Sequence, residues 1–229
     1  MNTLFPIRLN KFLAQYSGIS RRQADELILK GRVTINDTVA TIGDRVKEDS
    51  TVKVDGKAVS GDVAFVYLAL NKPRGYVCSR KRQGDSPTIY ELLPHEFRTL
   101  KTVGRLDRDS SGLILLTNDG DFAQRMTHPS YHKVKQYVVQ LDGALEPLHQ
   151  QMISDFGVNL DDGKSQLTLE RLSDDRKQWT VTMSEGRNRQ IRRTFTALGY
   201  TVTNLHRTDF GPYHLDTLKE GAFEKVTML

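Results

Sequence analysis

The sequence contains only one cysteine, Cys78, in 229 residues. A single thiol excludes a disulfide framework within the chain and any zinc site built from several cysteines. No apolar stretch approaches the roughly 20 residues that a membrane-spanning helix requires, and the first residues lack the pattern of a secretory signal peptide. These absences predict a cytoplasmic protein that is not embedded in a membrane.

Acidic residues are fewer than basic ones, and this imbalance is the first indication of a partner. The 33 Lys and Arg against 28 Asp and Glu give a formal charge of +5 and a sequence pI near 9.3. A basic excess favours an anionic partner such as nucleic acid. The 38% hydrophobic and 27% charged residues are typical of an ordinary globular protein.

The first sixty residues have the pattern of a small separate module. Residues 7–16 carry apolar side chains at helical spacing, and a second predicted helix opens with Ser20 and Gln23, the spacing of a capping box, and closes at Gly31. Short β-type segments follow over residues 32–59, the last with an Asp-Gly turn. Pattern alone would assign the basic residues around the second helix to a solvated face: Arg21, Arg22, Lys30 and Arg32.

The segments RLNKFLA, SRRQAD and GRVTIN resemble the RNA-binding domain named after a small-subunit ribosomal protein, also called the αL motif, over residues 7–56. The resemblance implies that these basic residues grip structured RNA by its shape and its phosphates. We expect this domain to occupy residues 1–58, a linker residues 59–64, and a larger domain residues 65–229.

The larger domain alternates strand-like and helix-like segments in an irregular order. An irregular order favours an α+β fold with a largely antiparallel sheet over a repeated βαβ arrangement. Strands are predicted near 65–70, 112–117, 134–141, 167–172 and 179–183, and helices near 146–156 and 189–198. Two basic groups beside glycines extend the expected RNA-binding surface: Lys72, Arg74, Arg80, Lys81 and Arg82, then Arg187, Arg189, Arg192 and Arg193.

Residues 103–120, VGRLDRDSSGLILLTNDG, crowd charges of both signs against an apolar run. A calcium loop would use Asp107 and Asp109, but Asn118 stands where the bidentate Glu belongs, and the run after the glycine is strand-like rather than helical. A hydrolase nucleophile at Ser110 or Ser111 would lack both the Gly-x-Ser-x-Gly elbow and a marked histidine base. Neither alternative fits the pattern well.

Two further catalytic patterns are weak. His128 and His132 have the spacing of a zinc pair, but Pro129 between them argues against a helix. A glycosidase requires a second carboxylate across a cleft, and nothing in the sequence shows that Asp109 faces the same way as Asp107. The pattern alone leaves a single carboxylate among arginines, either a structural ion pair or a catalytic group.

The stretch GRLDRDSSGLILLTNDG resembles the catalytic-aspartate motif of pseudouridine synthases, and its first four residues match the RsuA-type ribosomal RNA branch. Further segments resemble the same family in the same order over nearly the whole chain: LALNKPRGYVCS, HPSYHKVKQYVVQL, SEGRNRQIRRTFTALGY and LHRTDFGPYHLDTLKEGAFEKV. Thr194 and Asp209-Phe210 depart from the family pattern. The resemblance implies a catalytic domain with a mainly antiparallel mixed sheet and flanking helices, which isomerises a uridine of ribosomal RNA to pseudouridine.

The resemblance also implies roles for individual residues. Asp107 would be the essential catalyst, Tyr137 would stack on a flipped uracil, and Arg192 would favour the ionised carboxylate and orient it. Arg105 would fill the space that the base leaves. Whether the aspartate attacks C1′, attacks C6 or abstracts a sugar proton stays open.

The expected partner is ribosomal RNA or a ribosome-assembly intermediate, bound by a monomer without metal or cofactor. Contacts to RNA are expected from Arg105, Arg21, Arg22, Lys30, Arg32, Lys72, Arg74 and Arg189. The alternative is a non-catalytic RNA-binding or ribosome-assembly factor, which would explain the basic groups but not the matching positions of Asp107, Tyr137 and Arg192.

Overall fold

The computed structural model describes residues 5–60 and 64–229. The chain divides into two compact units, Met1–Phe65 with Asn118–Gly120 and Val66–Thr117 with Asp121–Leu229. Residues 61–63 of the expected linker lie outside the described residues. No helix within the described residues is long and apolar enough to cross a membrane.

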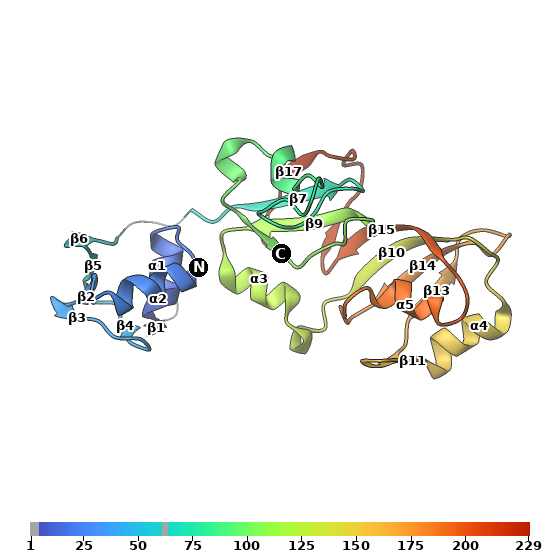
Figure 1. Ribbon diagram of the computed structural model, residues 1–229, viewed down its shortest axis with the longest axis horizontal. Coiled ribbons are helices and arrows are strands. Elements are labelled where there is room, and N and C mark those ends of the chain that lie inside the picture. The colour runs from blue at the N-terminus through green and yellow to red at the C-terminus, as the bar shows by residue number, and fades with distance from the viewer. Residues whose placement is uncertain (1–4, 61–63) are drawn as a thin grey trace. The chain divides into compact units, whose positions relative to one another are not determined.

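The N-terminal unit combines two helices with short strands around one apolar core (Figure 1). Helices α1 (Leu9–Tyr16) and α2 (Arg21–Leu29) contribute Leu9, Leu13 and Ala24 to this core. A four-stranded antiparallel sheet has the order β3 (Thr38–Val39), β2 (Val33–Ile35), β5 (Val52–Val54), β6 (Lys57–Ala58), and β1 (Ile7–Arg8) pairs with β4 (Arg45–Val46).

Two local signals of the N-terminal sequence are confirmed. The Ser20 hydroxyl accepts a hydrogen bond from the Gln23 backbone N–H at 3.2 Å, and the Gln23 side chain accepts one from the Ser20 N–H at 2.9 Å. This reciprocal pair satisfies two donors that a helix start leaves open. Asp55 and Gly56 both have positive φ, 48° and 76°, as a two-residue type I′ turn between β5 and β6 requires.

The second unit is built on a nine-stranded sheet. Its pairs are antiparallel except for β15 and β9, which run parallel, so the expected α+β fold with a mainly antiparallel mixed sheet is confirmed. The order is β13 (Thr168–Arg171), β14 (Gln178–Met183), β10 (Lys135–Leu141), β15 (Val202–Phe210), β9 (Ser111–Thr117), β7 (Tyr67–Lys72) and β17 (Phe223–Lys225), with β8 (Lys101–Val103) beside β9 and β16 (Tyr213–His214) beside β15.

Strand β9 lies at the centre of this sheet, and all seven of its residues are buried. Helix α5 (Gln190–Thr196) packs with Ile114 and Leu116 of β9, whereas helix α3 (Gly120–Thr127) packs with Leu113 and Leu115. Since alternate residues of a strand point to opposite faces, the two helices cover opposite faces of the sheet. The loop that precedes β9 therefore rests on a support buried on both sides.

Some elements differ from the prediction. The helix expected over 146–156 is α4 (Pro147–Gln151), followed by a π-helical turn over Met152–Phe156. Helix α3 and the nine-residue strand β15 were not predicted. The remaining elements are the hairpin β11 (Val158–Leu160) with β12 (Gly163–Ser165) and three short 3₁₀ helices, Ile89–Leu92, His95–Phe97 and Pro129–Tyr131.

Candidate active site

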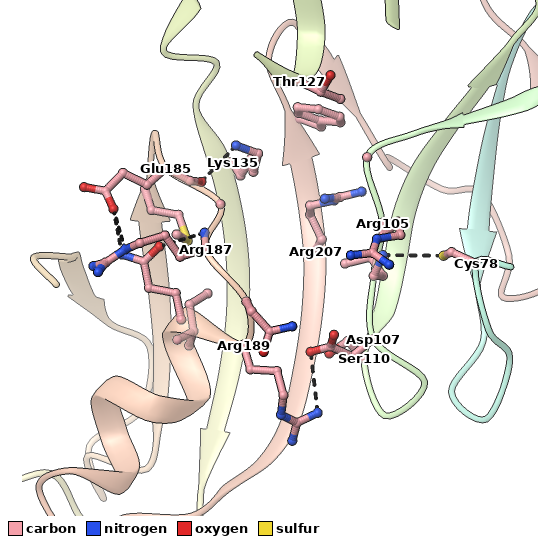
Figure 2. A pocket seen from close by; sticks show the side chains of 18 of the residues that line it. Cys78, Arg105, Asp107, Ser110, Thr127, Lys135, Glu185, Arg187, Arg189 and Arg207 are labelled. Atoms are coloured by element: carbon pink, nitrogen blue, oxygen red, sulfur yellow. Dashed lines mark hydrogen bonds and ion pairs between the residues drawn. The ribbon is translucent and has the colours of Figure 1, made fainter. Parts of the chain in front are cut away.

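The second unit, which is the catalytic unit that the resemblance implies, contains a pocket of about 800 Å³. Residues from the β8–β9 loop, β10, β15 and the β14–α5 loop line it. Its volume is in the range of small-molecule binding sites. Seven Lys and Arg side chains line it against three Asp and Glu, so the pocket favours an anionic ligand. Asp107, Tyr137 and Arg189 all belong to this lining, and Figure 2 shows Asp107 and Arg189 facing one another.

Asp107 lies in the loop between β8 and β9, and backbone contacts hold that loop. The Ser110 N–H donates to the Asp107 carbonyl at 3.1 Å, and the Gly75 N–H donates to the Arg108 carbonyl at 2.7 Å. The Leu106 N–H donates to the Cys78 sulfur at 3.4 Å. The carboxylate side chain is 35% exposed, so it is fixed at its base and reachable from the pocket.

Lys72 contributes to the support of this loop, in contrast to the expected RNA contact. Its side chain is fully buried, and its ammonium donates to the Ser110 carbonyl at 2.6 Å and to the Pro73 carbonyl at 2.9 Å. Burial lowers the pKa of Lys72 to about 8. A lysine with no exposed surface cannot reach an RNA phosphate, so this RNA-binding assignment is corrected.

Arg189, which the sequence predicted as an RNA contact, lies beside Asp107, where the resemblance had placed Arg192. Arg192 donates to the backbone carbonyls of Asp109 at 3.0 Å and Val202 at 2.6 Å, and it forms no ion pair with Asp107. Burial, and secondarily the charge of Arg189, lower the pKa of Arg192. The guanidinium beside the carboxylate belongs to Arg189, whose Nη1 lies 3.6 Å from Asp107 Oδ2.

The backbone of Arg189 is held by a clamp that sequence reasoning missed. Arg189 has left-handed backbone angles, φ 47° and ψ 31°, immediately before α5. In the same loop, Arg187 donates to the Asp162 carboxylate at 2.8 Å and to the Gly163 and Lys164 carbonyls at 3.0 and 2.8 Å. These acceptors belong to the β11–β12 hairpin. An arginine that appeared to be part of an RNA-binding group thus fixes the loop that carries Arg189.

Tyr137 lies in a row of paired residues that crosses five strands. The row consists of Val181, Tyr137, Arg207, Gly112 and Lys72. Paired residues in adjacent strands project to the same face, so Tyr137 and Arg207 are neighbours in the pocket that both line. Gly112 has φ 104°, and a Cβ there would overlap the backbone of Arg207, so this close approach of β9 and β15 requires glycine.

The other expected RNA contacts of the catalytic unit lie at the surface. Arg105 is exposed and lines the pocket. Arg74 is also exposed, and its guanidinium donates to the Thr203 carbonyl at 3.2 Å. Both side chains therefore remain available to a ligand outside the sheet.

The expected RNA contacts of the N-terminal unit are exposed. Arg21 donates to the Asn10 side chain at 3.1 Å, and Arg32 forms an ion pair with Asp55. Arg22 and Lys30 have no side-chain partner among the residues that the structure describes. The latter two are the least constrained cations of this group.

The alternative readings of the sequence find little support. Strand β9 begins at Ser111, where a calcium loop would have to continue towards a helix. A histidine does reach Ser111, since its hydroxyl lies 2.9 Å from His206 Nδ1, but neither residue lines the pocket. The Asp109 carboxylate pairs with Arg108 at 3.3 Å. The segment between His128 and His132 is a short 3₁₀ helix, Pro129–Tyr131, and not the α-helix that would place two histidines four residues apart on one face.

Known protein families match both units of the chain. A family model described as RNA pseudouridylate synthase matches residues 66–197, and the S4 domain model matches residues 7–52. The ribosomal small subunit pseudouridine synthase A of Pasteurella multocida is 38% identical, with 96% of each chain covered. The ribosomal large subunit pseudouridine synthase B of Bacillus subtilis is 35% identical over 96% of this chain and 92% of its own.

A solved pseudouridylate synthase is 33% identical to this chain, covers 96% of both chains and has a TM-score of 0.68. The family model spans more than half of the sequence, and the relatives span nearly all of it. The chain therefore belongs to the RNA pseudouridylate synthase family.

Proposed function

We propose that the protein converts a specific uridine of ribosomal RNA to pseudouridine, with Asp107 as the catalyst. The reaction breaks the N1–C1′ bond, turns the base and forms a C5–C1′ bond, so substrate and product are isomers. The observation that carries the proposal is the Asp107 carboxylate, paired with Arg189 at 3.6 Å in a pocket that Tyr137 lines. The two named relatives cited above act on ribosomal RNA of the small and large subunits.

Asp107 must be ionised to act as a nucleophile or as a base. The neighbouring guanidinium of Arg189 pairs with the carboxylate and limits its orientation. Arg192 has a positioning role in this proposal, because its donation to the Asp109 carbonyl holds the chain two residues after the catalyst. Attack at C1′, attack at C6 and abstraction of a sugar proton are all compatible with this arrangement.

The uridine has to leave its stack before a carboxylate can reach its ribose or its base. Tyr137 offers an aromatic face on which the flipped uracil can stack. It is 8% exposed, as suits a residue at the inner wall of a pocket. Arg105, exposed two residues before the catalyst, fills the vacated position in the RNA.

The N-terminal unit supplies sequence-independent affinity in this proposal. Arg22 and Lys30 are exposed, and a cation without a protein partner can neutralise an RNA phosphate and release counterions. Arg21 and Arg32 lie in the same unit and add to its positive surface. We infer that the protein acts as a monomer in the cytoplasm, where it meets ribosomal RNA or an assembly intermediate.

The direct test is tritium release from ribosomal RNA transcripts labelled at uridine C5, since pseudouridine formation replaces the hydrogen at that carbon. We expect the wild-type protein to release tritium from the RNA of one subunit, and carbodiimide mapping then locates the nucleotide. If free transcripts give no release, the assay is repeated on ribosome-assembly intermediates. Tight RNA binding without release from any of these substrates would contradict the proposal and favour a non-catalytic assembly factor.

A further inference from the structure

Arg207 is a buried cation whose hydrogen-bonding capacity is almost unused. Its side chain is 2% exposed, and its Nε–H donates to the Leu113 carbonyl at 2.7 Å. A guanidinium has five N–H donors, yet no described residue accepts a hydrogen bond from the other four. Among the described residues no carboxylate pairs with it either.

Arg176 shows that the fold can satisfy such a side chain when its role is structural. Like Arg207, it donates from Nε to a backbone carbonyl, that of Leu145, and its guanidinium lies over an aromatic ring, 5.3 Å from the centre of Trp179. Its Nη2 also donates to the Gln150 side chain at 2.9 Å. Arg176 is not part of the pocket lining. Arg207 therefore differs from the partly buried Arg176 in three ways: it is buried, its Nη groups have no hydrogen-bond partner among the described residues, and it lines the pocket.

The described groups around Arg207 do not supply the missing hydrogen-bond acceptors or a negative charge. Its guanidinium lies 4.8 Å from the ring centre of Phe210, and a second cation, Lys135, lies over the same ring at 5.6 Å. The hydroxyl of Ser110, which also lines the pocket, is buried without a hydrogen-bond partner among the described residues. Burying a charge without a partner is unfavourable, and such groups are characteristic of functional sites.

The position of Arg207 specifies which part of a nucleotide it can meet. It is paired with Tyr137 across β10 and β15, and Figure 2 shows it extending from β15 towards the loop that carries Arg105 and Asp107. Both Tyr137 and Arg207 are buried, whereas the cations suited to backbone phosphates, such as Arg74, are exposed. A base stacked on Tyr137 would lie beside the free guanidinium N–H groups.

We propose that Arg207 is a further catalytic residue, which donates hydrogen bonds to a carbonyl oxygen of the flipped uracil and stabilises the negative charge of the departing base. This inference rests on the proposed function. When the N1–C1′ bond breaks, its electron pair stays on the base, which becomes a uracil anion with charge on N1 and on the carbonyl oxygens. At the same time C1′ becomes bonded to the Asp107 carboxylate or, if Asp107 takes the C2′ proton, doubly bonded to C2′. After the base turns, C5 attacks C1′ as the Asp107 carboxylate leaves or returns that proton to C2′. The C5 proton then leaves and N1 gains a proton.

This role follows the general rule that fixed donors are most effective where charge develops during the reaction. It applies to the two routes in which Asp107 acts on the ribose, since both release the base as an anion. The guanidinium needs no reorganisation, because its Nε–H is already anchored on the Leu113 carbonyl.

The test compares uridine with 5-fluorouridine at the target position under single-turnover conditions. Fluorine at C5 withdraws electrons and stabilises the uracil anion by itself, so this substrate depends less on Arg207. Loss of the intact target nucleoside is followed after nuclease digestion by mass spectrometry. The variants are Arg207→Met, Arg207→Lys and, as a matched control, Arg176→Met, each with its melting temperature.

We expect Arg207→Met to slow conversion of uridine by about 100-fold, the size of effect seen when one transition-state donor is removed. The same variant should slow conversion of 5-fluorouridine about tenfold or less. Arg207→Lys, which keeps the charge but loses the planar fork, should give intermediate rates, and Arg176→Met should convert both substrates as the wild type does. If Arg207→Met does not fold, the ratio of the two substrates is taken from Arg207→Lys.

Equal slowing on both substrates would overturn the inference, because that is the signature of a displaced loop rather than of lost charge stabilisation. An unchanged rate on uridine would overturn it as well. Inactivity of the wild-type protein on every substrate would contradict the proposed function itself, so the two failures are distinguishable.

Discussion

The basic residues of the N-terminal unit and three of those that support the catalytic pocket, Lys72, Arg192 and Arg207, have the same chemistry but opposite environments. Arg22 and Lys30 of the N-terminal unit are exposed. In the catalytic unit, Lys72 and Arg207 are buried, and both donate to backbone carbonyls, as the partly buried Arg192 also does. In the proposed function the exposed cations meet RNA phosphates, whereas Lys72 and Arg192 hold the loop that carries Asp107. Arg207 is anchored by one donor and keeps the others for the base.

This difference shows that a cluster of positive charge has two distinct uses in one small protein. A guanidinium or ammonium that donates to a carbonyl in a dry interior fixes the backbone, because an unsatisfied carbonyl there is unfavourable. The same group in water stays mobile and acts through its charge alone. In the proposed function Asp107 needs both kinds, since a rigid loop aims it and an exposed surface brings the RNA to it.

The largest effect is expected from the glycine that lets β9 and β15 approach. A Cβ at Gly112 would overlap the Arg207 backbone, and its φ of 104° is unfavourable for other residues. We expect Gly112→Ala to destabilise the catalytic unit by about 4 kcal/mol or more. The matched variant Gly31→Ala, at φ 66° with Val39 at 3.9 Å as its nearest contact, should cost about 1 kcal/mol.

Denaturant unfolding with peptide-resolved hydrogen exchange assigns each loss to its unit. Equal losses for the two glycine variants would contradict the described packing of β9 against β15.

The pH dependence of the free energy of unfolding tests whether Lys72 is a buried cation. Its pKa is lowered from 10.5 to about 8 in the folded chain. Between these values the unfolded chain keeps a proton that the folded chain has lost, so stability rises with pH. From pH 7 to pH 9.5 we expect the free energy of unfolding of the wild type to rise by about 2 kcal/mol relative to Lys72→Met.

The corresponding variant of an exposed lysine, Lys30→Met, is measured over the same pH range as a control for the substitution. A pH-independent difference between wild type and Lys72→Met, measured by denaturant unfolding, would mean that Lys72 is not buried as a cation.

The exposed cations should affect binding and leave chemistry unchanged. We expect the double variant Arg22→Gln, Lys30→Gln to weaken RNA binding about tenfold and to reduce the slope of log affinity against log salt by about two, because two phosphate contacts are lost. Its single-turnover rate at saturating RNA should equal that of the wild type. A slower rate at saturation would show that the N-terminal unit also takes part in the chemical step.

The smallest effect is expected from the exposed ion pair between Arg32 and Asp55. Such pairs contribute little because water already solvates both charges. We expect Arg32→Gln to leave the free energy of unfolding nearly unchanged, measured by denaturant unfolding next to Asp55→Asn. A clear loss of stability in either variant would mean that this exposed pair stabilises its unit as the buried cations stabilise the catalytic unit.

The predictable parts of the fold are those that local chemistry determines. The capping box of Ser20 and the turn at Asp55-Gly56 satisfy local backbone groups, and both were identified from the sequence. Strand β15 was missed because two register shifts against β10 interrupt its alternation, and because a buried arginine, Arg207, stands at an inward position. Tertiary pairing, not local pattern, makes this segment a strand.

The sequence predicted the aspartate and the tyrosine of the candidate site, but not which of the neighbouring arginines pairs with the aspartate. Asp107 and Tyr137 share one pocket, as the resemblance implied. Arg189 and Arg192 are three residues apart at a loop–helix junction, so spacing alone cannot decide which one reaches the carboxylate. The decision depends on the clamp that Arg187 forms with a distant hairpin and on the left-handed backbone of Arg189. Lys72 was misassigned because local pattern does not reveal burial.

The most direct test of the central claim compares Asp107→Asn with Asp109→Asn. Both variants remove one carboxylate from the same loop, but Asp107 pairs with Arg189, whereas Asp109 pairs with Arg108. In single-turnover tritium release we expect Asp107→Asn to abolish pseudouridine formation without weakening RNA binding, and Asp109→Asn to retain at least about a tenth of the wild-type rate. Turnover by Asp107→Asn, or equal loss in both variants, would contradict the assignment of Asp107 as the catalyst.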